Sequence, residues 1–320
     1  MRSKVILKNS LWKWYLLPKD SNSLYMIRLA PGPVEVGGVH LANHLLLAAG
    51  VLGTTGASLA RILNTGAGGV VTKSLGPRPF PGHPGPCIAA FDGYMLNAMG
   101  LPNPSRGFRD EWGPLRGQPV IVSIFGGTPE EFRTVAGWFI DLAAGFELNL
   151  SCPHAEGFGS ALGSDPSIVE DCTRVVADLG LPTWVKLTPN VTDIVEIGIA
   201  AQDGGATALV AINTLKGMRI STELCRPVLG NRFGGVSGSA IFPVSIRCVY
   251  ELFDACSIPI IGCGGIRTAS DVLEMIMAGA SAVQIGSAVM EDEHIFQGIA
   301  AELYSPTGIN AEEILGCAHD

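Results

Sequence analysis

The sequence predicts an α/β fold, namely a (β/α)8 TIM barrel with inserted loops over the face formed by the carboxyl ends of the strands. Two observations predict this class: eight compact apolar runs recur along the chain, and a helix-like segment follows each run. Near-continuous apolar strands indicate burial on both faces, as in parallel sheets covered by helices. A doubly wound open sheet is the alternative, but the chain lacks the GxGxxG turn expected after the first strand of a dinucleotide-binding fold.

The expected strands follow one another at intervals that are mostly even. They are LLLAAG (45–50), GVVTKS (69–74), VIVSIFG (120–126), FELNLSC (146–152), TWVKLT (183–188), ALVAINT (208–214), PIIGCGGI (259–266) and AVQIGS (282–287). The second and third runs, and again the sixth and seventh, start about 50 residues apart, which is too far for a short connection and one helix. We therefore expect inserted loops at these two places, above the active face.

Residues 1–25 do not share this rhythm and are treated as an N-terminal extension of unknown role. We expect residues 26–320 to form a single barrel domain. With 320 residues, of which 47% are hydrophobic, the chain can bury a large core.

Composition excludes several classes of function. A net charge of -8, with only 21 Lys and Arg, argues against a nucleic-acid partner. No apolar run approaches the roughly 20 residues that span a bilayer, and the start of the chain lacks a signal-peptide layout, so we expect a cytoplasmic protein without a membrane span. The cysteines form no CxxC pair or cluster with histidine, so we expect no metal or iron–sulfur site in this chain.

Polar residues gather where the expected strands end. In a barrel the catalytic groups come from the carboxyl ends of the strands. One Asn or Ser at such a place often only closes a turn, but many polar groups at one face, including lysines that are costly to bury unpaired, indicate a site. The residues are Lys73, Ser74, Ser123, Asn149, Cys152, Lys186, Asn213 and Thr214.

Glycine-rich turns follow the seventh and eighth expected strands, at GCGGI (262–266) and IGSA (285–288). Barrels commonly bind a phosphate there through backbone N–H groups and a helix N-terminus. Together with the polar strand ends, these turns predict a site for a phosphorylated cofactor with a large planar head.

Six segments stand out: ELNLSCPH (147–154), NAMGLPNP (97–104), KLTPNVTDI (186–194), INTLKGMR (212–219), GGVSGSAIFPVSIR (234–247) and GCGGIRTASDVLEMIMAGASAVQIGSA (262–288). These segments resemble the class 1 dihydroorotate dehydrogenases, which are flavin-dependent barrels. The resemblance covers roughly residues 26–290, and NTLKGMR with the loop to GGVSG is most similar to the catalytic subunit of the two-subunit, NAD-linked branch. The motifs, CPH above all, are also similar to the pyrimidine-reducing domain of dihydropyrimidine dehydrogenases.

The resemblance implies that FMN lies over the strand ends. Its phosphate would bind the backbone at Gly264, Gly265, Gly286 and Ser287, with Gly238 closing the far side. Lys186 is the candidate for a cation that stabilises the negative charge of the reduced ring. The residues expected to touch the ring are Ala49, Gly50, Lys73, Ser74, Ser123, Asn149, Lys186 and Thr214.

The resemblance also implies a reaction, the oxidation of (S)-dihydroorotate to orotate in pyrimidine (UMP) biosynthesis. One ring carbon gives a hydride to FMN, while Cys152 acts as the general base that removes a proton from its neighbour. Asn97, Asn149 and Asn213 would hold the ring, since their amides match the edges of a pyrimidine. The substrate carboxylate would meet Lys73 and the N–H groups of Met99, Gly100 and Leu101, and the expected substrate site is completed by Thr214 and His154.

His154 departs from the resemblance, because dihydroorotate enzymes usually carry Asn at this place. The imidazole can supply the same hydrogen bond, or it can tune Cys152 or shift specificity toward an uncharged pyrimidine. Two other functions therefore stay open: a dihydropyrimidine dehydrogenase-like catalytic subunit acting on uracil or thymine, and a non-catalytic flavin-binding scaffold. A uracil-type reductase binds no carboxylate, and the NAMGLPNP segment favours the dihydroorotate reading.

The expected partners follow from the lack of a sequence motif through which this chain could pass electrons to NAD. Because the chain carries neither a nicotinamide fingerprint nor a cysteine cluster, the NAD-linked resemblance implies a separate electron-transfer subunit with an iron–sulfur cluster and FAD. Fumarate as a direct acceptor is the alternative. The resemblance also implies a homodimeric core.

Overall fold

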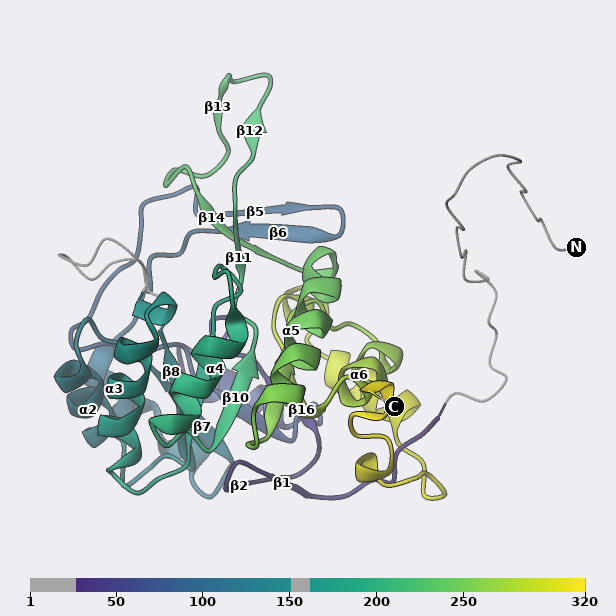
Figure 1. The fold of residues 1–320 in the computed structure, drawn as a ribbon. Coiled ribbons are helices and arrows are strands. Elements are labelled where there is room, and N and C mark those ends of the chain that lie inside the picture. Colours follow the sequence, from purple (N-terminus) through teal and green to yellow (C-terminus); the bar gives the residue numbers. More distant parts are fainter. Residues whose placement is uncertain (1–26, 151–161, 320) are drawn as a thin grey trace, which may run out of the picture.

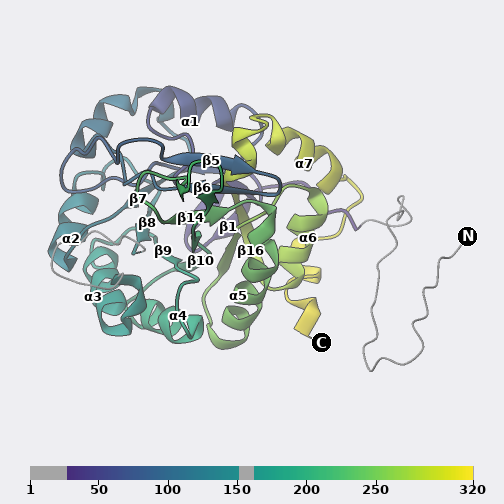
Figure 2. The ribbon, with the colours of Figure 1, turned by 90° about the horizontal axis from the view of Figure 1, so that it is seen from above.

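A computed structural model describes residues 27–150 and 162–319, and its centre is a closed barrel of parallel strands (Figure 1, Figure 2). Each predicted apolar run contributes one strand, and β16 closes the barrel by pairing with β3, Val283 against Leu45. The predicted (β/α)8 barrel is confirmed, and the open sheet is wrong. Around the barrel the strands are β3 (Leu45–Leu47), β4 (Gly69–Val71), β7 (Val120–Ile124), β8 (Gly145–Asn149), β9 (Thr183–Leu187), β10 (Ala208–Ala211), β15 (Ile260–Cys263) and β16 (Ala280–Ile285).

Helices cover the outside of the barrel (Figure 2). Most begin after a Thr or Asp whose side chain accepts a hydrogen bond from an N–H of the first turn, as Thr268 does from Asp271. These helices are α1 (Gly56–Leu63), α2 (Pro129–Gly137), α3 (Pro166–Ala177), α4 (Ile194–Asp203), α5 (Phe242–Ala255), α6 (Ala269–Met277) and α7 (Ile295–Leu303). Among the described residues, none of the helices is long and apolar enough to cross a membrane.

Both predicted insertions are present and meet in one small sheet. The first lies between β4 and β7 and contains β5 (Ile88–Phe91) and β6 (Tyr94–Asn97); the second lies between β10 and β15 and contains β11 (Leu215–Gly217), β12 (Ile220–Ser221), β13 (Arg226–Pro227) and β14 (Gly234–Ser237). The antiparallel sheet has the order β11-β14-β6-β5. Because β11 begins just after β10 ends, this sheet lies over the carboxyl ends of the barrel strands (Figure 1).

Short 3-10 turns connect these elements. They are η1 (Ser105–Glu111), η2 (Gly113–Leu115), η3 (Leu162–Ser164), η4 (Ser239–Ile241), η5 (Ser287–Met290), η6 (Ala311–Glu313) and η7 (Cys317–His319).

A hairpin of β1 (Val34–Val36) and β2 (Val39–Leu41) covers the opposite end of the barrel (Figure 1). Its buried residues join the apolar cluster that fills the lower barrel interior, which includes Ile121 and Trp184. The hairpin turns at Gly37, where φ is +52° and an added Cβ would lie 2.7 Å from the carbonyl oxygen of Thr207. The Trp184 indole N–H donates to the carbonyl of Gly37 over 3.3 Å, so this end of the barrel is sealed by packing and by a directed hydrogen bond.

Trp184→Ala should lower the free energy of unfolding by about 3 to 5 kcal/mol, because the mutation leaves a cavity where a fully buried indole filled the barrel. Denaturant unfolding followed by circular dichroism measures this loss. Ile220→Ala, at a side chain that is 58% exposed, is the matched control and should change stability by less than about 0.5 kcal/mol. Equal stability of the two variants would contradict this account of the barrel floor.

Candidate active site

A continuous chain of hydrogen bonds joins the polar residues at the ends of four strands. The Ser74 and Ser123 hydroxyls lie 2.9 Å apart, and the Asn149 amide donates to Ser74 over 3.1 Å. The Asn213 amide donates to Asn149 Oδ1 over 3.3 Å, and its own Oδ1 accepts from the N–H of Thr214 over 2.8 Å. The structure therefore brings these five sequence-predicted residues together. Each side-chain amide is held in one orientation by its neighbours.

Lys73 is a buried cation beside this chain. Its side chain is 6% exposed, and its ammonium donates to the carbonyl of Gly50 over 3.0 Å. Burial lowers the pKa of Lys73. Within the described part of the chain no carboxylate forms an ion pair with Lys73. A buried ammonium held by one carbonyl is stabilised when an anion binds beside it, so the site is suited to a negatively charged ligand.

Lys186 lies deeper, in the barrel interior, and has partners of its own. Its ammonium donates to Gln284 Oε1 over 2.8 Å and lies 3.7 Å from the Glu147 carboxylate. The Gln284 amide in turn donates to the other oxygen of Glu147 over 2.5 Å. Sequence reasoning selected Lys186 but missed Glu147 and Gln284. Glu147 stands in the quoted ELNLSCPH segment, two residues before Asn149 and on the same face of β8.

The glycine turns after β15 and β16 expose bare backbone. Gly264 and Gly265 have φ of +128° and +80°, and a Cβ at Gly265 would lie 2.8 Å from the backbone nitrogen of Phe242. Within the described residues, and outside the strand ladders, the N–H groups of Gly265, Gly286 and Ser287 donate no hydrogen bond to the chain. Such donors, beside a turn at Gly265 that excludes a side chain, are a suitable donor set for a phosphate.

Gly238, which was predicted to close this cradle, begins η4 with φ of +103°. A Cβ there would lie 2.9 Å from the carbonyl oxygen of Gly93, in the turn between β5 and β6. From η4 the chain enters α5, where the Ser245 hydroxyl donates to the carbonyl of Cys263 over 2.6 Å. One segment therefore connects Gly238 to the turn at Gly264. Ala49 and Gly50, also predicted to touch the cofactor, follow β3 at the same end of the barrel.

The insertion sheet brings Asn97 to the barrel mouth. The Asn97 amide donates to the carbonyl of Gly235 over 3.4 Å, and a Cβ at Gly235 would lie 2.1 Å from Thr214 Oγ1. Asn97 is therefore separated from Thr214 only by the backbone of Gly235.

The segment Met99–Leu101 follows β6 and is anchored by residues that sequence reasoning missed. Asn103 donates to the carbonyl of Leu101 over 2.9 Å, and its Oδ1 accepts from the N–H of Gly76 over 3.1 Å. The Ser105 hydroxyl donates to the carbonyl of Gly76 over 2.7 Å. Gly76 stands two residues after Ser74, so Asn103 and Ser105 attach the segment beside the hydrogen-bonded chain of strand ends. Met99, Gly100 and Leu101 lie in the same insertion as Asn97, and Leu101 has φ of +55°.

Two predicted site residues, Cys152 and His154, lie outside the described residues. The described strand β8 ends at Asn149, three positions before Cys152 in the sequence. Their predicted roles stay predictions.

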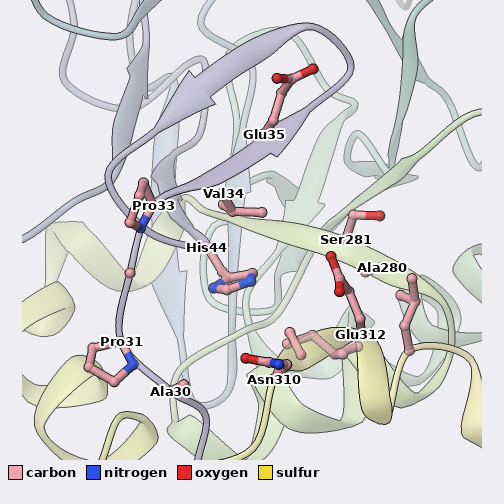
Figure 3. Close-up of a pocket in the computed structure, with 14 residues that line it drawn as sticks. Ala30, Pro31, Pro33, Val34, Glu35, His44, Ala280, Ser281, Asn310 and Glu312 are labelled. Atoms are coloured by element: carbon pink, nitrogen blue, oxygen red, sulfur yellow. The ribbon is translucent and has the colours of Figure 1, made fainter. Parts of the chain in front are cut away.

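A separate cavity of about 340 Å³ lies at the other end of the barrel, beside the β1–β2 hairpin (Figure 3). Glu35, His44, Ser281 and Glu312 are among its lining residues. Burial lowers the pKa of His44, and nearby Glu312 opposes this effect. None of the predicted site residues that the structure describes lines this cavity, so it is distinct from the strand ends of the candidate active site.

Comparisons with known proteins identify a matching family and several similar relatives. The family model described as dihydroorotate dehydrogenase matches residues 33–306. A protein of Methanocella arvoryzae is 53% identical over 292 residues, covering 89% of this chain and 97% of its own, and one of Methanosarcina mazei is 54% identical over 294 residues, covering 88% and 94%. A protein of Pyrococcus abyssi is 45% identical over 293 residues, covering 89% and 98%.

All three relatives are named dihydroorotate dehydrogenase B (NAD(+)), catalytic subunit. The predicted resemblance to the catalytic subunit of the NAD-linked branch is confirmed by these names. The chain therefore belongs to the dihydroorotate dehydrogenase family.

Proposed function

We propose that the protein oxidises (S)-dihydroorotate to orotate, in pyrimidine biosynthesis, with FMN bound at the carboxyl end of the barrel. The observation that carries the proposal is Lys73, a buried ammonium that has a carbonyl but no carboxylate as its described partner. Dihydroorotate brings a carboxylate to such a cation, whereas an uncharged pyrimidine does not. The names of the relatives support the same substrate.

The donor set of the glycine turns supports FMN as the cofactor, in a family that is generally flavin-dependent. We propose that Gly264, Gly265, Gly286 and Ser287 hold the phosphate, with Gly238 on the far side. When bound, FMN supplies the acceptor for the two electrons that the substrate loses. Ala49, Gly50, Lys73, Ser74, Ser123, Asn149, Lys186 and Thr214 would surround the ring.

The asparagines are proposed to orient the pyrimidine ring. Asn149 and Asn213 are already fixed by the hydrogen bonds from Ser74 to Thr214, so the orientation of their amides is set before substrate arrives. Asn97 approaches from the insertion sheet. Cys152 is proposed to take the proton from the ring carbon next to the one that is oxidised, and His154 to hydrogen-bond the substrate or the loop. The carboxylate would be held by Lys73 and the N–H groups of Met99, Gly100 and Leu101.

The names of the relatives also support a partner, because each is called a catalytic subunit. We propose a second subunit with an iron–sulfur cluster and FAD that passes electrons to NAD, and a homodimeric core. Within the described residues no group of three or more His, Cys, Asp or Glu side chains is arranged to hold a metal ion. In this proposal the second subunit brings the iron–sulfur centre.

Product formation tests the proposed function directly. The FMN-loaded protein, kept without air and without a partner subunit, should convert about one equivalent of dihydroorotate to orotate per FMN, since no acceptor reoxidises the cofactor. Chromatography measures the orotate. A flavin-loaded protein that forms no orotate would contradict the proposal.

Gly265→Ala should weaken FMN binding by about tenfold or more, because the new Cβ would clash with the backbone of Phe242 and shift the turn that carries the phosphate donors. Fluorescence titration of the apoprotein with FMN measures the dissociation constant. Gly298→Ala in α7, where a Cβ meets nothing within 4 Å, is the matched control and should leave FMN affinity unchanged. Unchanged affinity in the Gly265 variant would remove these turns from the proposed phosphate site.

A further inference from the structure

A buried trio of charged and polar side chains crosses the barrel interior beneath the candidate active site. Glu147 on β8 is 0% exposed, Lys186 on β9 is 5% exposed, and Gln284 on β16 is 0% exposed. Strand β16 lies across the barrel from β8 and β9, with β3, β4 and β7 between them on one side. Gln284 therefore reaches through the interior to contact both charged groups.

The orientation of Gln284 is dictated by the two charges. Its carbonyl oxygen accepts from the Lys186 ammonium, and its amide nitrogen donates to Glu147 Oε2. The other carboxylate oxygen, Oε1, lies 3.7 Å from the Lys186 nitrogen and has no hydrogen-bond partner within the described chain. The lysine is therefore drawn toward Glu147 by charge and held in position by the glutamine.

The trio lies at the boundary between an apolar floor and a polar mouth. Below it, side chains such as Ile121, Trp184 and Ile261 fill the barrel down to the β1–β2 hairpin. Above it, two residues further along β8, Asn149 belongs to the hydrogen-bonded strand ends. Lys186 thus lies next to the apolar floor of the site.

Stability alone does not explain an ion pair in this place. Desolvation of two charges can exceed their attraction, and well-packed apolar residues of similar volume are often equally stabilising. Loss of one partner, in contrast, leaves an uncompensated buried charge. The trio is therefore better explained by what it does to Lys186 than by its contribution to folding.

We propose that Glu147 is a positioning residue that keeps Lys186 charged and fixed beneath the barrel mouth, where the ammonium balances the negative charge gained when bound flavin is reduced. The inference rests on the proposed function, because it requires FMN above Lys186. Glu147 touches neither substrate nor cofactor in this proposal and acts through the lysine.

The surroundings of Lys186 agree with this role. Burial lowers the pKa of Lys186, while Cys263 and Glu147 raise it, and the net direction is upward. Of the strands packed around it, β8 contributes Glu147 and β15 contributes Cys263, whereas β10 and β16 present no titratable side chain. Burial raises the pKa of Cys263, which favours the neutral thiol. The carboxylate of the trio is that of Glu147, 3.7 Å from the Lys186 nitrogen.

Redox titration of the FMN-loaded protein at several pH values tests the proposal. The slope of midpoint potential against pH gives the number of protons taken up with the two electrons. In E147Q, burial of Lys186 is no longer opposed by a carboxylate, so the lysine is deprotonated in the oxidised protein and regains its proton on reduction. We expect E147Q to take up one proton more than the parent protein in part of the range from about pH 6 to 9.

Three further variants make the result specific. E147D, whose shorter side chain withdraws the carboxylate from Lys186, should show the extra proton only toward the upper end of the range. The double variant E147Q/K186M should lose it, because the titrating group is gone. E302Q, at an exposed residue of α7, should match the parent protein.

The outcomes separate the two proposals. If E147Q and E147D both show the slope of the parent protein, Glu147 does not have the proposed role. If E147Q does not fold, the slope of E147D alone decides. An extra proton that persists in E147Q/K186M would also overturn the proposal. A parent protein that binds no FMN would overturn the proposed function itself.

Discussion

Cys152→Ala is expected to slow the reduction of bound FMN by dihydroorotate by about 10²- to 10⁴-fold, the usual contribution of a positioned acid or base. The substrate must lose a proton as well as two electrons, and the thiol is the group that the family resemblance assigns to the proton. An ordinary thiol has a pKa of about 8.5, so a modest local effect suffices to make it a base near neutral pH. Anaerobic stopped-flow absorbance of the flavin measures the rate.

Two control measurements test whether the effect is specific to the proton transfer. Cys225→Ala removes an exposed thiol and should leave the rate unchanged. In the Cys152 variant, orotate should still bind to the oxidised protein, because the carboxylate and amide contacts are intact. A Cys152→Ala protein reduced as fast as the parent would exclude this residue as the base.

Lys73→Met should raise the dissociation constant of orotate by about 10- to 100-fold. A charge-assisted hydrogen bond is worth about 1.5 to 3 kcal/mol, and methionine fills the space of the lysine stem without its charge. Lys216→Met, at an exposed lysine of β11, is the matched control and should leave the affinity unchanged. Perturbation of the flavin spectrum by orotate measures binding. Equal affinities of the parent and Lys73→Met proteins would remove the lysine from the anion site.

The same lysine predicts a pH dependence of binding. Burial lowers the pKa of Lys73 from its ordinary value of 10.5. Because the orotate carboxylate prefers the protonated lysine, affinity should be highest below the pKa of the free protein and should fall as pH rises through it. Binding to the Lys73→Met protein should lack this fall. A parent protein whose affinity for orotate does not change up to about pH 10 would contradict the role of Lys73.

Much of the fold is predictable from the chain because buried parallel strands are apolar over their whole length. The runs at 45–50 and 208–214 illustrate this, since each becomes a barrel strand that ends at the site. Barrel topology then brings the strand ends together, which is why Ser74, Asn149 and Asn213 could be selected without coordinates. The hydrogen bonds between them agree with that reasoning.

The hydrogen-bond partners of the selected residues are harder to predict from the sequence. Gln284 meets Glu147 over a separation of 137 residues, and the contact depends on which layer of the barrel each side chain enters. That layer is set by the stagger of the strands, which the apolar pattern does not reveal. Asn103 was missed for a related reason, because its role comes from docking one insertion against Gly76.

The barrel floor is another feature that sequence reasoning did not identify. The hairpin VEVGGVHL precedes the first barrel strand and has the alternation of an ordinary two-stranded ribbon. Its function as a seal depends on Gly37 meeting Trp184, a contact between residues 147 positions apart. No local sequence pattern indicates that these two residues come into contact.

The measurement that tests the account most directly is anaerobic mixing of the FMN-loaded protein with dihydroorotate and, separately, with dihydrouracil, while the flavin absorbance is followed. The account predicts rapid bleaching by dihydroorotate and none by dihydrouracil, since only the first brings a carboxylate to Lys73. Bleaching by dihydrouracil alone would contradict the account and make His154 the residue that sets specificity.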